Sequence, residues 1–217
     1  MPIRSISFFT YRSSGGGWTQ PQLGVLRFVR AIKDEALGGD GYVLINDTEP
    51  KRFLQESNAA DAFDWFAEMA LRHISKELCT TNVSLVPIPD SGCTENMATS
   101  RTKALADAVA MSASAVMVSD VLRWHQKQLP AHRGGPRDPA ELYQNLRLPG
   151  GWTPEARPYV LVDDVTTSGG HIRACAALLK SRGADVRLAI CGAKAEQLFD
   201  GDPYKERIET HDDFEPM

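Results

Sequence analysis

The sequence feature that most constrains the fold is the stretch YVLVDDVTTSGG, residues 159–170. Its unbroken apolar run from Tyr159 to Val162 is typical of a strand that is buried on both faces of a parallel sheet. The polar and glycine residues that follow predict a turn, and a helix is expected to begin near His171. Because open α/β sheets bind ligands at such strand ends, we expect the functional site here.

The residues after this strand differ in what they can bind. Small side chains from Thr166 to Gly170 let backbone N–H groups approach an anion, and the following helix directs its positive end the same way. This pattern predicts a cradle for a phosphomonoester. Asp163 and Asp164 would repel a phosphate, but they can accept hydrogen bonds from sugar hydroxyls or hold Mg²⁺, directly or through water. Together these features describe a site for a phosphorylated ribose.

The stretch VLVDDVTTSGG resembles the 5-phosphoribosyl-1-pyrophosphate (PRPP) motif of type I phosphoribosyltransferases, in which apolar residues precede two acids and a Thr/Ser/Gly loop. The resemblance covers roughly residues 83–191. It implies that the acids act in catalysis and hold the metal. It also implies a group of residues that bind the 5-phosphate: Val165, Thr166, Thr167, Ser168, Gly169 and Gly170. An ordinary strand, polar turn and helix is the alternative interpretation.

A second loop follows a strand predicted at Val83 to Val86. Two prolines and a glycine in Pro87-Ile88-Pro89-Asp90-Ser91-Gly92 exclude a continued strand or helix, so a fixed loop is expected. The resemblance implies that residues 87–91 of this loop bind pyrophosphate through backbone N–H groups, often with a strained peptide. A plain connecting loop is the alternative.

A long polar segment, Ser119 to Pro158, is expected to be functional or irregular because loops of this length are unusual within a compact domain. The resemblance implies a mobile loop that closes over PRPP, with Arg123 and Lys127 as catalytic cations. A solvated basic surface is the alternative. The rest of the basic group comprises His125, His132, Arg133, Arg137 and Arg147.

Within the family, Val86-Pro87-Ile88-Pro89 is most similar to the ComF-like, competence-associated branch. Further similarity comes from Arg123, Gln128, Arg133 and Asn145-Leu146-Arg147. That branch usually carries Arg-Gly-Phe-Asn-Gln after the Pro-x-Pro turn, whereas residues 93–102 of this chain offer only Asn96 and Arg101.

The alternation of strands and helices predicts an α/β fold with a doubly wound parallel sheet. Residues 1–80 are expected to form a separate N-terminal layer, a hood-like subdomain with a short strand at Ile6 to Phe9 and another at Tyr42 to Ile45. Residues 81–195 are the expected phosphoribosyltransferase core, which includes the mobile loop at 119–158. Residues 196–217 are a C-terminal extension, whose acidic end is expected to fray.

Composition limits the remaining classes of function. A net charge of −4 argues against a general nucleic-acid surface. No apolar run approaches the roughly 20 residues that span a membrane, and the start is too weakly apolar for a signal peptide, so a cytoplasmic protein is expected. The four scattered cysteines indicate neither zinc nor a disulfide framework: Cys79, Cys93, Cys175 and Cys191.

These features predict a Mg²⁺-dependent phosphoribosyltransferase that moves the 5-phosphoribosyl group of PRPP to a nitrogen acceptor and releases pyrophosphate. A non-catalytic PRPP- or nucleotide-sensing regulator is the main alternative, and an enzyme acting on another ribose phosphate is a third. The resemblance implies that elements outside the core, residues 1–80 and 192–217, read the small-molecule acceptor. It also implies a homodimer as the common arrangement.

Overall fold

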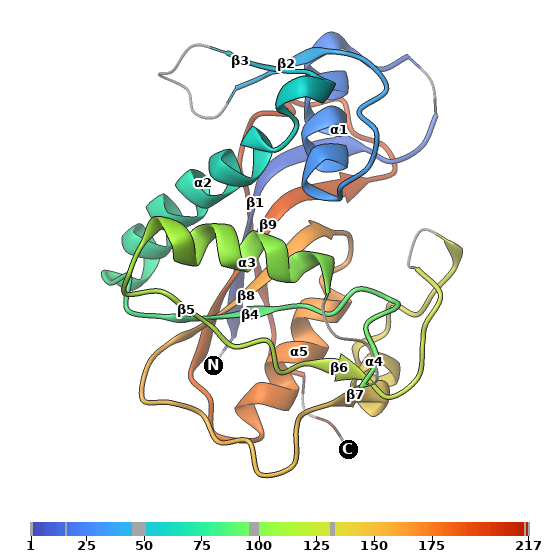
Figure 1. The fold of residues 1–217 in the computed structure, drawn as a ribbon. Helices are drawn as coiled ribbons and strands as arrows, with labels where there is room; N and C mark the ends of the chain where they lie inside the picture. The colour runs from blue at the N-terminus through green and yellow to red at the C-terminus, as the bar shows by residue number, and fades with distance from the viewer. Residues whose placement is uncertain are drawn as a thin grey trace.

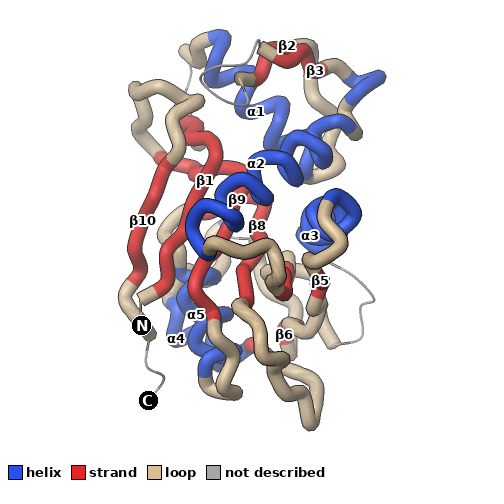
Figure 2. The backbone as a smooth tube through the Cα atoms, turned by 90° about the vertical axis from the view of Figure 1, so that its left-hand side faces the viewer, coloured by secondary structure: helices blue, strands red, loops and turns tan. Residues whose placement is uncertain are grey.

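The computed structural model describes residues 2–15, 17–44, 51–95, 100–130, 133–214 and 216. A six-stranded sheet, in the order β10–β1–β9–β8–β4–β5, forms its centre (Figures 1 and 2). Five strands are parallel neighbours: β1 (Ile3–Arg12), β4 (Ser84–Pro87), β5 (Met117–Val118), β8 (Tyr159–Thr166) and β9 (Val186–Glu196). The edge strand β10 (Arg207–His211) pairs antiparallel with β1. The predicted α/β fold with a mostly parallel sheet is confirmed.

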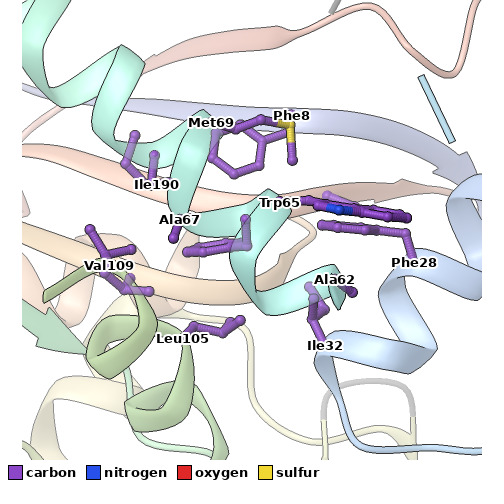
Figure 3. Close-up of a cluster of buried hydrophobic side chains, with 14 of the residues drawn as sticks. Phe8, Phe28, Ile32, Ala62, Trp65, Ala67, Met69, Leu105, Val109 and Ile190 are labelled. Carbon is purple, nitrogen blue, oxygen red and sulfur yellow. The ribbon is translucent and has the colours of Figure 1, made fainter. Parts of the chain in front are cut away.

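Helices cover both faces of the sheet. One face packs against α1 (Gln20–Ile32), α2 (Asp61–Leu78) and α3 (Arg101–Ser112), and Figure 3 shows side chains of this cluster, among them Phe8, Phe28, Met69 and Ile190. The other packs against α5 (Gly170–Lys180) and α4 (Pro139–Asn145). Val160 and Val162 belong to the first cluster, whereas Tyr159 and Leu161 belong to the second. The apolar run of β8 is therefore buried on both sides, as its composition predicts.

The first strand departs from the prediction of a separate N-terminal layer. β1 covers ten residues rather than the expected four and lies inside the central sheet, between β9 and β10. Its apolar pattern is broken by Ser5 and Ser7, which are nevertheless fully buried. A strand with buried serines cannot be recognised by hydrophobic periodicity alone. The division into an N-terminal subdomain, a core and an extension stays a prediction.

The remainder of the N-terminal region lies around α1. Thr19 and Gln22 form a capping box at the start of α1, which fixes where this helix begins. A small antiparallel pair, β2 (Gly41–Val43) and β3 (Arg52–Leu54), lies beside it, followed by a short 3₁₀ turn at Glu56–Asn58. The strand expected at Tyr42 to Ile45 corresponds to β2, and Ile45 lies outside the described residues.

The segment expected to be a mobile loop contains regular structure. β6 (Arg123–Trp124) pairs antiparallel with β7 (Leu146–Arg147), and α4 lies between them in the chain. Leu122, Trp124 and Leu142 are fully buried in the second cluster. These apolar side chains, spread among polar ones, anchor the segment to the core. His132 lies outside the described residues.

The last described residues pack along α5 instead of fraying. Lys180 forms an ion pair with Asp213 at 2.5 Å, and Arg173 Nε donates to the Asp212 carbonyl at 3.3 Å. The ring of Phe214 lies 5.8 Å from that of Tyr143 on α4. Among the described residues, no helix has the length and apolar character needed to cross a membrane.

Candidate functional site

The two adjacent acids lie within β8, because this strand continues four residues beyond the expected end at Val162. Asp163 Oδ1 accepts a hydrogen bond from the Asp164 amide at 2.9 Å. Burial, and next the negative charge of Asp164, raise the pKa of Asp163 well above its usual value, although Lys33 and Arg101 oppose this. Two carboxylates are thus held together in a poorly solvated place, where hydroxyl donors or a cation would stabilise their charge.

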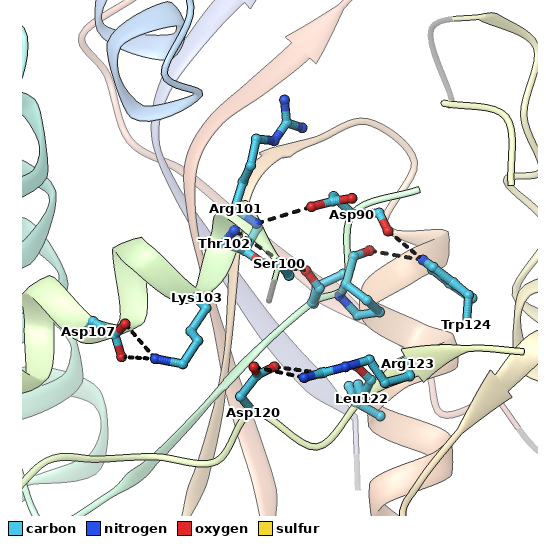
Figure 4. Close-up of polar contacts among 12 residues, drawn as sticks. Asp90, Ser100, Arg101, Thr102, Lys103, Asp107, Asp120, Leu122, Arg123 and Trp124 are labelled. Atoms are coloured by element: carbon cyan, nitrogen blue, oxygen red, sulfur yellow. Dashed lines mark hydrogen bonds and ion pairs between the residues drawn. The ribbon is translucent and has the colours of Figure 1, made fainter. Parts of the chain in front are cut away.

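Arg101 supplies a cation to this pair that sequence reasoning did not assign to the site. It is the first residue of α3, and its Nη2 lies 3.5 Å from Asp164 Oδ2. Its Nη1 lies 3.9 Å from Glu35 Oε1, and its backbone N–H donates to Asp90 Oδ2 at 3.1 Å. Figure 4 shows Arg101 above Asp90. The sequence signal that could have identified Arg101 was its position directly after Ser100, because serine often caps the start of a helix.

A tyrosine from the N-terminal strand also faces the acids. The pKa of Tyr11 is raised to about 12, first by burial and then by the charges of Asp164 and Glu35. Tyr11 is near the end of β1, and Glu35 follows α1. The N-terminal region therefore forms one side of the site.

The loop after β4 lies beside the end of β8, because the Ile88 amide donates to the Val162 carbonyl at 2.9 Å. This bond uses the Ile88 N–H that was expected to serve pyrophosphate. Since Pro87 and Pro89 have no N–H, only the amides of Asp90 and Ser91 remain within residues 87–91. All peptide bonds of this loop are trans, so the strained peptide that the resemblance implies is not a cis peptide bond.

Asp90 organises the turn itself. Its carboxylate accepts from the Gly92 amide at 2.9 Å, and its carbonyl accepts from the Cys93 amide at the same distance. Trp124 reaches over from β6, and its indole N–H lies 3.2 Å from the Pro89 carbonyl oxygen and 2.9 Å from that of Asp90. The loop is therefore fixed by its own side chains and by the long segment that follows.

The expected catalytic cations lie in different surroundings. The guanidinium of Arg123 forms a fork with Asp120, with distances of 2.7 and 2.9 Å to the two carboxylate oxygens (Figure 4). Hydrogen bonding to Asp120 raises the pKa of Arg123 further. Lys127 is exposed to solvent. Arg123 is thus already ion-paired, in contrast to the expectation of a cation waiting for ligand.

The predicted phosphate loop is shorter than its motif. Thr166 is the buried last residue of β8 and pairs with Lys194 of β9, which leaves Thr167 to Gly169 as the turn. Gly169 has a φ of +75° and caps α5, a conformation that favours glycine. In the part of the chain that the structure describes, the amides of residues 168–171 donate to no acceptor. These amides at a helix start are suited to an anion.

Two further contacts border this helix start. A β-carbon added to Gly170 would overlap the carbonyl oxygen of Arg137, so the long segment lies directly against it. The His171 ring packs edge-on to Trp124, with ring centroids 5.8 Å apart. Burial lowers the pKa of His171, while the charge of Asp164 raises it and that of Arg137 lowers it. The long segment thus contacts both loops that are expected to bind ligand.

The donor set can be compared with the requirements of Mg²⁺. Over the described ranges, no group of three or more His, Cys, Asp or Glu side chains is arranged to hold a metal ion. Asp163 and Asp164 supply carboxylate oxygens, the ligand type that Mg²⁺ prefers. Because Mg²⁺ usually keeps several waters and is bound by one or two carboxylates together with substrate oxygens, these residues fit such an ion.

The known proteins to which this chain is similar are solved structures. No protein-family model matches the chain, and no curated protein matches it in sequence. Among solved structures it is similar to an adenine phosphoribosyltransferase from Thermoanaerobacter pseudethanolicus, with 16% identity over 66% of this chain and 88% of that one, at a TM-score of 0.41. It is also similar to a hypoxanthine phosphoribosyltransferase from Staphylococcus aureus in two crystal forms. The tetragonal form has 10% identity over 61% of this chain and 72% of that one, and the orthorhombic form 12% over 63% and 75%, both at a TM-score of 0.38.

Proposed function

We propose that this chain is a phosphoribosyltransferase that transfers the 5-phosphoribosyl group of PRPP to a nitrogen acceptor and releases pyrophosphate. The observation that carries the proposal is that β8 and the helix after it bring two different kinds of binding group together. β8 carries a buried pair of carboxylates in its second half, and the helix that follows begins with amides that have no acceptor among the described residues. A sugar diol beside a phosphate matches this combination.

Each segment has a role in the proposal. The amides of the turn, with Val165 to Gly170, hold the 5-phosphate, and Asp163 and Asp164 hold the ribose hydroxyls. The loop at residues 87–91 and the Arg101 guanidinium contact the pyrophosphate, with Arg123 and Lys127 as further cations if the long segment moves. Because displacement at the anomeric carbon passes through an oxocarbenium-like state, the site acts mainly by positioning the sugar and stabilising the leaving group.

Mg²⁺ is part of the proposal as an ion held by Asp163 and Asp164, directly or through water. When bound, it neutralises charge on the departing pyrophosphate. The acids contribute independently by orienting the ribose, and Arg101 contributes a positive charge to the same region. The acceptor would be bound between Tyr11 and the segment after α1, since the charges of Asp164 and Glu35 both act on Tyr11 and Glu35 pairs with Arg101. The ComF-like branch and a homodimer remain predictions.

A binding-only regulator is a second candidate that two contacts favour. The Ile88 amide is used by the sheet, and Arg123 is paired with Asp120. A protein that senses PRPP needs the phosphate cradle and the acids, but it does not need cations that stabilise the departing pyrophosphate.

Pyrophosphate release distinguishes the two functions. Purified protein is incubated with Mg²⁺ and PRPP over a panel of nucleobases, together with the double variant Asp163→Asn/Asp164→Asn. Asp107→Asn is the matched control, since Asp107 pairs with Lys103 on the outside of α3. A transferase releases pyrophosphate with at least one base, and only the double variant loses this. PRPP binding without release would support the regulator, and absence of binding would refute both.

A further inference from the structure

The last strand places a histidine against the phosphate loop, although the two are far apart in sequence. His211 ends β10, where it pairs with Ile3 of β1. A β-carbon added to Gly169 would overlap the His211 ring at Cε1 and would lie 2.7 Å from Nδ1. A side chain at residue 169 would therefore displace the ring. The imidazole edge that carries Nδ1 therefore faces the residue that caps α5.

The two ring nitrogens of His211 have different surroundings. Nε2 lies 2.8 Å from the hydroxyl of Ser5, a residue that is fully buried in β1. Because a hydroxyl can donate or accept, this bond persists in either neutral tautomer and in the charged ring. Within the described residues, Nδ1 has no hydrogen-bond partner. One nitrogen thus fixes the ring, and the other is available beside the unpaired amides of the helix start.

We propose that His211 is a phosphate-binding residue of this site, whose Nδ1–H donates to the phosphomonoester held at the start of α5. The proposal rests on the proposed function for the identity of the ligand, a ribose 5-phosphate group. It adds a side-chain donor from the C-terminal segment to a cradle otherwise made of main-chain amides. A charged imidazole would also add a full positive charge, which strengthens hydrogen bonds to phosphate.

The charges around the ring set the direction of its pH dependence. Glu209 on β10, Lys194 on β9 and Arg173 on α5 face it, and Ser5 on β1 is neutral. Burial lowers the pKa of His211 most, Glu209 opposes this, and Lys194 and Arg173 lower it further. The surroundings of the ring thus favour its neutral form. An anion favours the protonated ring, so binding takes up a proton and the affinity rises as the pH falls.

The residues that follow His211 fix its position through contacts with α5. The next two residues are anchored to α5, since Asp212 accepts from Arg173 and Asp213 pairs with Lys180. Lys194 is itself held by Glu209, with distances of 2.5 and 2.6 Å to the two carboxylate oxygens. The ring is therefore part of a fixed arrangement that needs no large movement to meet a ligand.

The test is calorimetric binding of ribose 5-phosphate at pH 6 and pH 8. The variant His211→Gln can keep a bond to Ser5 but cannot be charged. Lys76→Gln is the control, since Lys76 is exposed on α2, which packs against the face of the sheet opposite to α5. The phosphate itself titrates near pH 6, so the contribution of His211 is the difference between wild type and variant at each pH. We expect His211→Gln to weaken binding about tenfold at pH 6 and less at pH 8, with no change in the control.

The outcomes separate this inference from the proposed function. Equal affinities of wild type and His211→Gln at both pH values would overturn the role of His211 and leave the phosphate site standing. Failure of the wild type to bind ribose 5-phosphate would overturn the phosphate site, and the role of His211 with it. If His211→Gln does not unfold cooperatively, His211→Asn serves as the second variant, with the same expected loss.

Discussion

The guanidinium of Arg101 lies 3.5 Å from the carboxylate of Asp164, measured from Nη2 to Oδ2. The pair joins the start of α3 to the strand that carries the site, and the Arg101 amide binds Asp90 in the neighbouring loop. A cation of the protein itself thus partly neutralises one of the two acids. A ligand that offers hydroxyls to the acids and phosphates to the arginine would satisfy both groups.

Replacing Arg101 by alanine therefore tests this arrangement. We expect Arg101→Ala to weaken PRPP binding about tenfold, because a charge-assisted contact to phosphate is lost. The free energy of unfolding should fall by less than about 1 kcal/mol, since the arginine side chain is 48% exposed. Calorimetry and urea unfolding measure the two quantities. Lys103→Ala, two residues along the same helix, should leave PRPP binding unchanged; equal losses in both variants would contradict a specific role.

Asp163 gives a prediction about pH. Its pKa is raised in the fold, so the native state holds a proton at pH values where the unfolded chain has ionised, above about 4. The native state then binds more protons than the unfolded state, and this group's contribution to stability decreases as the pH rises from about 4 through the raised pKa. Asn has no charge to bury and can still accept from the Asp164 amide.

We accordingly expect Asp163→Asn to be more stable than wild type at pH 7 without ligand, with a smaller difference at pH 4. Urea unfolding at the two pH values measures this, with Asp107→Asn as the exposed control. The gain should accompany a loss of pyrophosphate release. A variant that is less stable than wild type at pH 7 would show that the charge of Asp163 does not destabilise the fold.

The candidate site was proposed from the part of it that is continuous in the chain. The apolar run, the two acids and the small residues up to Gly170 indicate strand, ligand groups and helix start without reference to other segments. The prediction of where β8 ends was wrong, because the acids remain in the sheet opposite Cys191 and its neighbours. Aspartate has a low propensity for strands, and the pairing of β8 with β9 overrides this preference.

The contributions from distant segments could not be predicted in this way. Arg101 reaches the candidate site through the packing of α3 against the sheet, and His211 reaches it through the pairing of β10 with β1. No periodicity in the sequence encodes either proximity. The polar residues Arg4 and Ser5 left Ile3 outside the expected strand at Ile6 to Phe9, which hid the pairing of Ile3 with His211. The long segment looked irregular because Leu122, Trp124 and Leu142 are isolated apolar residues in a polar sequence.

Trp124 is expected to matter for stability through its indole N–H. The side chain is fully buried and donates toward the carbonyls of Pro89 and Asp90. Trp124→Phe keeps a ring but removes the donor, and it should lower the free energy of unfolding by about 1–3 kcal/mol. Urea unfolding measures this. Trp152→Phe, at a partly buried ring, should cost clearly less, and a reversed order would contradict the support that Trp124 gives to the loop.

Gly170 is expected to be intolerant of any side chain. Its added β-carbon would overlap the Arg137 carbonyl, so the long segment or α5 would have to shift. Gly170→Ala should lower the unfolding free energy by about 1–3 kcal/mol and weaken PRPP binding. Gly150→Ala is the control, because an added β-carbon there meets nothing within 4 Å. Full PRPP binding by Gly170→Ala would show that this contact is unimportant for the site.

The most direct test of the central claim is a thermal melt with Mg²⁺, with and without PRPP, on wild type and on Asp163→Asn/Asp164→Asn. PRPP at about a hundred times its Kd should add roughly 2.7 kcal/mol, which for a chain of this size raises the Tm by about 5–10 °C. The account predicts this rise in the wild type and its loss in the double variant, which should still unfold cooperatively. Absence of a rise in the wild type at saturating PRPP, or an equal rise in both proteins, would contradict it.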